Sequence, residues 1–219
     1  MICSVLSRLK KMCMAGILCC AGFFLLNTQS QAAPQLQGYV MQVQLTPAVC
    51  ALDPSKQKQR KCLEGYSLTI TGLLPETTQR DCESKSVANL SPLQAKVVAR
   101  VIPDEGSRNQ LWHSVGGCVP MNASQYFRTL INLADKLKVP ADLSNPENKT
   151  VQHNTLKSQF IRLNAGMNSD SIRFVCQSSS QNPVLTEIKV CYRVNGQYKQ
   201  CSSQIVSNCP SSFAIKGTY

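Results

Sequence analysis

Apolar and polar side chains alternate in two segments of the first third of the chain. Residues 39–45 and residues 66–71 both show the period of two that is typical of half-buried strands. Gly72 and Pro75 follow the second segment, and both residue types interrupt strands. We therefore expect two strands here, the second ending near residue 71.

The last third of the chain is again rich in β-branched and aromatic residues. Residues 172–176, 185–194 and 212–215 predict three strands. The pair Asn195-Gly196 directly follows the second of them and is typical of a tight hairpin turn. The C-terminal part of the protein is therefore expected to be mainly β-structure.

Helical spacing replaces this alternation in the middle of the chain. Ser91-Pro92 predicts the start of a helix, because proline is favoured at the first helical position. The apolar positions expected on one face of this helix are Leu93, Val97, Val98 and Val101. A shorter segment, residues 110–116, ends at Gly116-Gly117.

Two further helices are expected after residue 121. Asn122 is a favourable cap for a longer helix, and Pro140 ends that run. Its apolar positions keep helical spacing and are Tyr126, Phe127, Leu130, Ile131 and Leu133. Asn154 predicts the start of another helix, with Leu156, Phe160 and Ile161 as its apolar positions.

The order of these elements predicts the fold class. Strands come first, then helices, then strands again, without the regular alternation that a parallel sheet needs. We expect an α+β fold in which a mostly antiparallel central sheet is flanked by helices. Residues 33–219 are expected to form a single domain, which at this length folds without a partner.

The first 32 residues have the composition of a secretory signal. Basic Arg8, Lys10 and Lys11 precede an apolar run over residues 12–26, and small residues follow near Ala32. The run is shorter than the roughly 20 residues of a membrane-spanning helix, although an uncleaved anchor remains the alternative. We expect cleavage after Ala32 or Ala33, no transmembrane segment in the mature chain, and export to a periplasm or to the exterior.

Cysteine usage agrees with export. Of twelve cysteines, eight lie in the expected mature chain: Cys50, Cys62, Cys82, Cys118, Cys176, Cys191, Cys201 and Cys209. An even number in an exported chain predicts disulfides rather than free thiols. Zinc is the rival interpretation, but the mature chain has no Cys-x-x-Cys pair and only two histidines. We expect no metal and no cofactor.

The mature chain is basic. Lys and Arg number 23 against 12 acidic residues, and removal of the signal leaves a net charge of +8. This charge is compatible with RNA, with anionic envelope polymers or with lipid headgroups, and it selects none of them. Lys56, Lys58, Arg60 and Lys61 lie between Cys50 and Cys62, either as phosphate contacts or as a solvated loop.

Two segments resemble a known enzyme family. Residues 68–75 (Leu-Thr-Ile-Thr-Gly-Leu-Leu-Pro) resemble the first active-site block of the ribonuclease T2 family, Phe-Thr-Ile-His-Gly-Leu-Trp-Pro. Residues 111–118 (Leu-Trp-His-Ser-Val-Gly-Gly-Cys) resemble its second block, Glu-Trp-x-Lys-His-Gly-Thr-Cys. Tyr126-Phe127 follows at the family's distance, and residues 208–219 are similar to the end of bacterial periplasmic ribonucleases of this family. The resemblance spans residues 39–219.

The resemblance implies a ribonuclease T2-like fold and four disulfides. The implied pairs are Cys50–Cys62, Cys82–Cys118, Cys176–Cys209 and Cys191–Cys201. Each would close a loop of roughly 10 to 35 residues and stabilise the protein by about 2–4 kcal/mol.

The resemblance also implies a reaction that this chain lacks the residues to perform. Family enzymes move the ribose 2′-OH onto the neighbouring phosphate, with one histidine as base and another as acid. The two histidine positions are occupied here by Thr71 and Val115. The supporting tryptophan, glutamate and lysine positions are occupied by Leu74, Leu111 and Ser114. Hydroxyl and aliphatic side chains do not exchange protons near neutral pH, so no catalytic set is intact.

Four other residues are candidates for a site. His113 lies two positions before the family histidine, and on a helix that offset turns its ring about 200° away. His153 precedes an expected helix and suits a solvated or capping role. Trp112 and Tyr126 could stack bases, or pack on helix faces as ordinary core residues.

We therefore expect an exported monomer with the ribonuclease fold and no RNA cleavage, which keeps RNA or nucleotide binding or acts through a protein partner. Two alternatives stay open. One is an active or weakly active endoribonuclease that forms 2′,3′-cyclic phosphates at a displaced site, and the other is a secreted effector or inhibitor. Leu74, Leu111 and Val115 would exclude substrate if they plug the groove.

Overall fold

The computed structural model describes residues 35–178 and 182–217. The expected export signal, residues 1–32, lies outside the described residues. Within the described part of the chain, no helix combines the length and the apolar character needed to cross a membrane.

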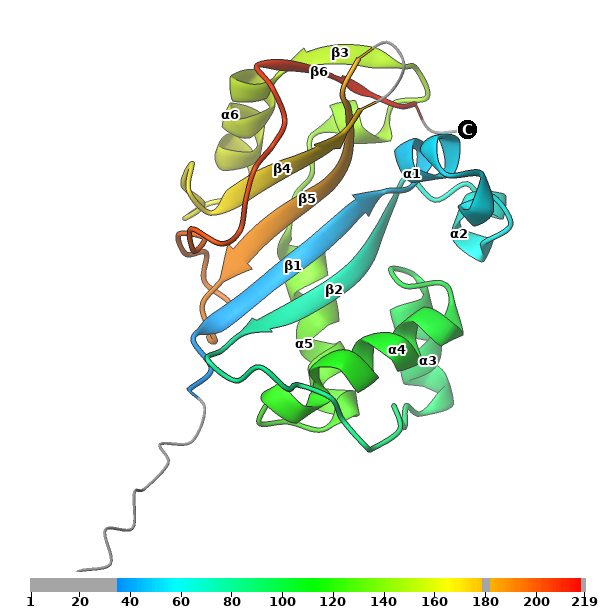
Figure 1. Ribbon diagram of the computed structural model, residues 1–219, viewed down its shortest axis with the longest axis vertical. Helices are drawn as coiled ribbons and strands as arrows, with labels where there is room; N and C mark the ends of the chain where they lie inside the picture. Colours follow the sequence, from blue (N-terminus) through cyan, green and yellow to red (C-terminus); the bar gives the residue numbers. More distant parts are fainter. Residues whose placement is uncertain (1–34, 179–181, 218–219) are drawn as a thin grey trace, which may run out of the picture. The chain divides into compact units, whose positions relative to one another are not determined.

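Six strands form one mixed sheet in which most neighbours run antiparallel (Figure 1). The strands are β1 (Gly38–Leu45), β2 (Leu68–Glu76), β3 (Lys149–Gln152), β4 (Ile172–Gln177), β5 (Val184–Tyr192) and β6 (Ser212–Ile215). Their order is β2-β1-β5-β6-β3, and β4 also pairs with β5. Val184 of β5 and Ala214 of β6 form a parallel pair. The α+β fold with a mostly antiparallel sheet is therefore confirmed.

The strand boundaries differ from the sequence prediction in three places. The strand predicted at 66–71 continues through Gly72 and Pro75 as far as Glu76, because β2 is an edge strand and tolerates a proline without an N–H donor. β5 ends at Tyr192 rather than at residue 194. The short strand β3 was not predicted, because only its pairing with β6 distinguishes four residues of mixed polarity from a loop.

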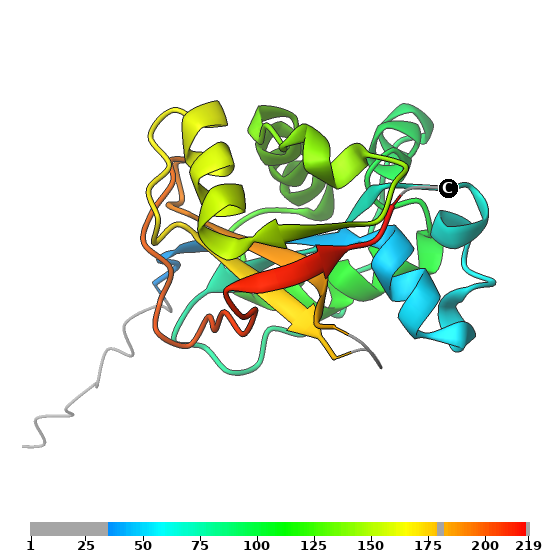
Figure 2. The same ribbon diagram turned by 90° about the horizontal axis from the view of Figure 1, so that it is seen from above.

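The described helices are α1 (Thr46–Leu52), α2 (Arg60–Leu63), α3 (Pro92–Ala99), α4 (Glu105–Val115), α5 (Ala123–Lys136) and α6 (His153–Leu163). Short 3₁₀ segments occupy Pro54–Lys56, Gly116–Cys118 and Ala141–Ser144. Figure 2 shows α5 and α6 over the same face of the sheet. In Figure 1, α3 and α4 lie beyond the β2 edge. This arrangement leaves β2 facing α4.

Helix caps explain most of the helix boundaries. The side chains of Ser91 and Asn122 accept hydrogen bonds at the starts of α3 and α5, as predicted, and Asn122 forms a reciprocal capping box with Gln125. Asn154 does not cap α6, which begins one residue earlier at His153. α5 already ends at Lys136, four residues before Pro140.

Two helix predictions are wrong for reasons of packing. The segment predicted at residues 110–116 is the second half of the longer helix α4, which begins at Glu105. Leu93 was expected on the apolar face of α3 but is 74% exposed. Val98 is the residue of that face that is fully buried. The helix therefore contacts the core through a narrower stripe than its sequence suggests.

The core lies between the sheet and the α5–α6 layer. The buried face of α5 presents Tyr126, Phe127 and Leu130. The Tyr126 hydroxyl donates a 2.9 Å hydrogen bond to the carbonyl oxygen of Leu73 in β2. Burial raises the pKa of this hydroxyl far above its usual range, so it remains a donor. This bond ties the edge strand to the helix layer.

Four disulfides are formed, in the pairs that the resemblance implies: Cys50–Cys62, Cys82–Cys118, Cys176–Cys209 and Cys191–Cys201. They account for every cysteine between residues 35 and 217, so none of these thiolates is available to a zinc ion.

A close backbone contact holds the end of α4. The N–H of Gly117 donates to the carbonyl oxygen of Cys82 at 2.9 Å, and the N–H of Ser84 donates to the carbonyl oxygen of His113 at 2.7 Å. A Cβ atom on Gly117 would lie 2.6 Å from the carbonyl oxygen of Glu83. Only glycine at residue 117 allows the two backbone segments to come this close. The Cys82–Cys118 disulfide links the same two segments covalently.

We expect Gly117→Ala to lower the free energy of unfolding by about 1–3 kcal/mol, because the added methyl group meets backbone that has no rotamer to change. Gly106 in α4 is the matched control, since a Cβ there meets nothing within 4 Å. Gly106→Ala should raise the free energy of unfolding by about 0.5–1 kcal/mol through helix propensity. Urea unfolding of both variants measures the difference, and similar values for the two would contradict the close contact.

Candidate functional site

A β-bulge places the side chains of β2 around a cleft. Gln42 of β1 pairs with Gly72, but the next residue, Val43, pairs with Ile70, so Thr71 is the extra residue of the bulge. In a regular strand, residues 71 and 74 would point to opposite faces. The bulge brings the exposed Thr71 and the half-buried Leu74 to the same cleft.

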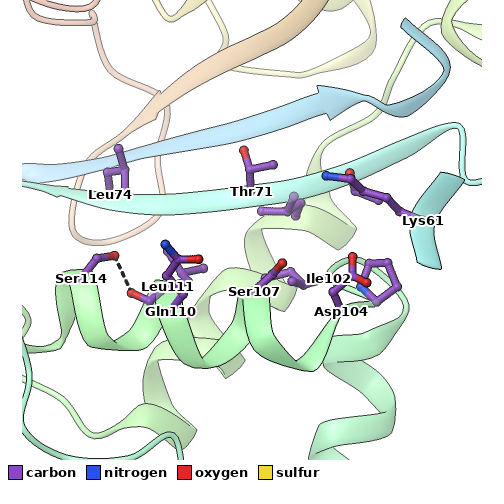
Figure 3. A pocket seen from close by; sticks show the side chains of 12 residues that line it. Lys61, Thr71, Leu74, Ile102, Asp104, Ser107, Gln110, Leu111 and Ser114 are labelled. Atoms are coloured by element: carbon purple, nitrogen blue, oxygen red, sulfur yellow. Dashed lines mark hydrogen bonds between the residues drawn. The ribbon is translucent and has the colours of Figure 1, made fainter. Parts of the chain in front are cut away.

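The opposite wall of the cleft is α4. Leu111 and Ser114 face β2 from this helix, together with Ser107 and Gln110 (Figure 3). The enclosed volume is about 280 Å³, at the lower end of the range for small-molecule sites. Leu74 and Leu111 therefore narrow the cleft without filling it.

Four of the five positions that the family resemblance marked as catalytic or supporting thus line one cleft: Thr71, Leu74, Leu111 and Ser114. The fifth, Val115, is only 2% exposed and belongs to the core, so it does not plug the cleft. The Ser114 hydroxyl donates to the carbonyl oxygen of Leu111 at 2.8 Å within its own helix.

Two charged side chains line the cleft, at the end away from Leu74 (Figure 3). Lys61 donates from Nζ to Oε1 of Gln44 at 2.7 Å. Burial lowers the pKa of the Lys61 ammonium group, and the negative charge of Asp104 opposes that shift. Asp104 stands at the cap position of α4, but its carboxylate does not bond to the helix. The cleft therefore has one cation, one carboxylate and a net charge near zero.

A buried arginine fixes the Asp104 end of the cleft. Arg108 of α4 is 9% exposed, and its guanidinium donates to the carbonyl oxygens of Ile102 and Pro103 at 2.8 and 2.9 Å. Ile102 and Pro103 line the cleft directly before Asp104. Sequence reasoning missed this end of the site, although Pro103-Asp104-Glu105 is a typical helix start.

The structure separates the four basic candidates between Cys50 and Cys62. Lys56 pairs with Asp53 at 3.3 Å, and Arg60 pairs with Glu64 at 2.6 Å. Lys58 is exposed and lies outside the cleft. Lys61 alone of the four lines the cleft, so the basic segment does not act there as a group.

The two aromatic candidates are core residues, which agrees with helix-face packing, one of the two interpretations that the sequence leaves open. Trp112 is 3% exposed and Tyr126 is fully buried, and their rings pack together with centroids 5.8 Å apart. The Trp112 indole N–H donates to the Ser86 hydroxyl at 3.1 Å. A base could reach these rings only if the core opened.

Neither histidine lines the cleft. His113 is exposed on α4, on a different side of the helix from the buried Val115, as helix geometry requires. His153 begins α6 and packs edge-on against Phe174 with ring centroids 5.2 Å apart. No three His, Cys, Asp or Glu side chains within residues 35–178 and 182–217 form a group that could hold a metal ion.

Comparison with known proteins gives one family and several similar structures. The sequence model of the Ribonuclease T2 family matches residues 37–201. The sequence has no significant match among curated proteins.

Three solved structures illustrate the likeness. The self-incompatibility-associated SF11-RNase of Nicotiana alata has a TM-score of 0.65 at 12% identity, over 84% of this chain and 99% of that one. A variant of RNase MC1, an enzyme from bitter gourd seeds, in complex with 5′-UMP has a TM-score of 0.63 at 16% identity, over 82% and 98%. An RNase-related protein from Calystegia sepium has a TM-score of 0.60 at 17% identity, over 84% and 98%. At these identities the likeness shows the fold.

Trp112 can be observed directly, because it is the only tryptophan in the sequence. We expect iodide to quench its fluorescence weakly in the folded protein and strongly after unfolding in urea, because the folded chain shields the indole. Equal quenching in the two states would show that the ring is open to solvent and would restore it as a stacking candidate.

Proposed function

The chain belongs to the ribonuclease T2 family, and from that premise we propose that it is an exported member that holds RNA in the Thr71 cleft without cleaving it. The observation that carries the proposal is the lining of the cleft by Thr71, Leu74, Leu111 and Ser114. The sequence resemblance aligns these four residues with the family's catalytic and supporting positions. None of these side chains titrates near neutral pH.

Cleavage by 2′-OH transfer needs a base and an acid whose protonation states interconvert at working pH. Asp104 and Lys61 are the titratable groups among the cleft-lining side chains. A carboxyl group and an ammonium group both lack the near-neutral intrinsic pKa that lets an imidazole accept the 2′-OH proton or donate one to the leaving oxygen. Loss of one acid–base group costs about 10² to 10⁴ in rate, and both are missing here.

RNA binding is supported by what remains in the cleft. Lys61 offers an ammonium group to a phosphodiester, and Thr71, Ser107 and Gln110 offer neutral hydrogen-bonding groups. The structurally similar RNase MC1 variant was crystallised with 5′-UMP. A near-neutral cleft suits a single phosphodiester group, which carries one charge, better than a phosphate group that carries two.

Export is supported by the disulfides and by the first 32 residues. Four disulfides persist in oxidising compartments and are rare in the cytosol. The basic and apolar pattern of residues 1–32 supplies the corresponding signal. The periplasm and the exterior both satisfy this proposal.

The rival function is an active endoribonuclease, which family membership itself favours. His113 is its strongest candidate residue, because its exposed imidazole could accept a proton from RNA bound outside the cleft. The other alternative is that the protein acts on a protein partner as an effector or inhibitor. No specific contact surface among the described residues supports it.

We expect the purified mature chain to leave polyuridylic acid intact and to generate no 2′,3′-cyclic phosphate ends, because no acid–base pair lines the cleft. The measurement is end-group analysis of the RNA, with an active ribonuclease of the same family as the positive control. Cleavage that His113→Ala abolishes would overturn the proposal in favour of the displaced site. A His113→Ala preparation purified in parallel also controls for contaminating nucleases.

We expect the dinucleotide uridylyl-(3′→5′)-uridine to bind weakly in the cleft, and Lys61→Gln to weaken this binding about fivefold or more, because it removes the charge-assisted bond to the phosphodiester. Lys58→Gln, with the same change of charge in the same segment but outside the cleft, should bind like the parent protein. Isothermal titration calorimetry at low salt measures the three affinities. Equal losses in both variants would indicate a diffuse electrostatic effect instead of a site.

A further inference from the structure

A second pocket lies away from the Thr71 cleft. It is formed where α5 ends, where α6 ends and at the hairpin turn that follows β5, and its volume is about 650 Å³. Three basic side chains line it: Lys136 and Lys138 from the end of α5, and Arg193 from the hairpin. We call it the α5–α6 pocket. None of its lining residues lines the cleft.

The α5–α6 pocket has an unbalanced charge. No aspartate or glutamate is among the described residues that line it, and the described ion pairs involve none of its three cations. Asp135 adjoins Lys136 in sequence, but successive residues on a helix point about 100° apart. Three cations therefore face one depression without a protein carboxylate to neutralise them.

The ends of two helices offset part of this charge. A helix C-terminus is equivalent to about −0.5 of an elementary charge, and the ends of α5 and α6 both meet the pocket. Three full positive charges exceed these opposing partial charges, so the pocket keeps an excess of positive charge. That excess favours an anion with more than one negative charge, such as a phosphomonoester, which carries about −1.5 to −2 at pH 7.

The backbone around the cations is held in place by side-chain hydrogen bonds. Asn164 is 3% exposed; it donates to the Lys138 carbonyl oxygen and accepts from the Lys138 N–H, both at 2.8 Å. The Tyr198 hydroxyl donates to the same Asn164 side chain at 3.1 Å, and the Tyr198 ring packs on Tyr192 with centroids 5.2 Å apart.

The hairpin fixes the third cation. The N–H of Arg193 donates to the carbonyl oxygen of Gln197 at 2.7 Å, and the N–H of Gly196 donates to the carbonyl oxygen of Arg193 at 2.9 Å. The backbone that carries Lys138 and Arg193 therefore needs little rearrangement when an anion binds, which lowers the cost of binding. The side chains of Lys136, Lys138 and Arg193 are exposed and accessible to an incoming anion.

We propose that the α5–α6 pocket binds a phosphate dianion, either as inorganic phosphate or as the phosphomonoester of a nucleotide. The residues that hold it are Lys136, Lys138 and Arg193. The proposal does not rest on the function assigned to the cleft, because the two sites share no lining residue and differ in net charge.

The first test is titration of the mature protein with inorganic phosphate at low salt. We expect saturable binding that is weakened about tenfold or more in the triple variant Lys136→Gln/Lys138→Gln/Arg193→Gln. The control Lys96→Gln/Arg100→Gln/Arg128→Gln removes the same charge from exposed positions outside this pocket and should bind like the parent. Absence of phosphate binding, or equal losses in both triple variants, would overturn the proposal. Thermal unfolding of both variants checks that they fold.

The second test locates the ligand by nuclear magnetic resonance. Phosphate should shift the amide signals of Gly166 and Gly196, which line the α5–α6 pocket, and leave that of Gly72 in β2 unchanged. The dinucleotide should shift the signal of Gly72 and leave those of Gly166 and Gly196 unchanged. Failure of one site is therefore distinguishable from failure of the other. Tighter binding of 5′-UMP than of phosphate would identify a nucleotide as the source, and equal binding would identify free phosphate. Shifts confined to Gly72 with phosphate would contradict the proposal.

Discussion

The separation between β2 and α4 is the constraint on which the cleft depends. Two attachments set it from opposite sides: the Tyr126 hydroxyl bonds to the Leu73 carbonyl in the middle of β2, and the Gly117–Cys82 contact with its disulfide fixes the end of α4. Both attachments use the backbone of the elements they hold. Neither attachment uses a side chain that faces the cleft, so an exposed cleft residue such as Thr71 can change without releasing either of them.

This division is compatible with different side chains at the cleft positions that the family resemblance marks as catalytic. Thr71 and Ser114 are exposed, so exchanging their side chains costs little stability. Leu111 and Val115 are the exceptions, because both are buried among core residues, and Val115 stands at a position where the resemblance expects a histidine. An aliphatic side chain there adds apolar burial that an imidazole would not supply, since a buried polar ring needs hydrogen-bonding partners. An aliphatic residue at this position therefore favours the fold.

The sequence predicted those features that local rules determine. The caps at Ser91 and Asn122, the turn at Asn195-Gly196 and the strand pattern of β1 depend on neighbours within a few residues, and the structure has them. The bulge at Thr71, the exposure of Leu93 and the burial of Trp112 depend on which distant segment lies opposite. The disulfide pairs came from the family resemblance, because eight cysteines alone allow 105 pairings. Lys61 was one of four equal candidates in the sequence, and only the fold distinguishes it, because it bonds to Gln44 of β1 and lines the cleft.

Net charge distinguishes the two pockets more sharply than volume or polarity. In the cleft, Lys61 attracts an anion that enters, and the carboxylate of Asp104 repels it. In the α5–α6 pocket, three cations attract a dianion, and no carboxylate among the lining residues repels it. The two helix ends oppose this attraction only in part. A strand of RNA carries phosphodiesters along its length and a phosphomonoester only at an end. The two sites therefore suit different parts of the same class of molecule, and neither requires the other to be occupied.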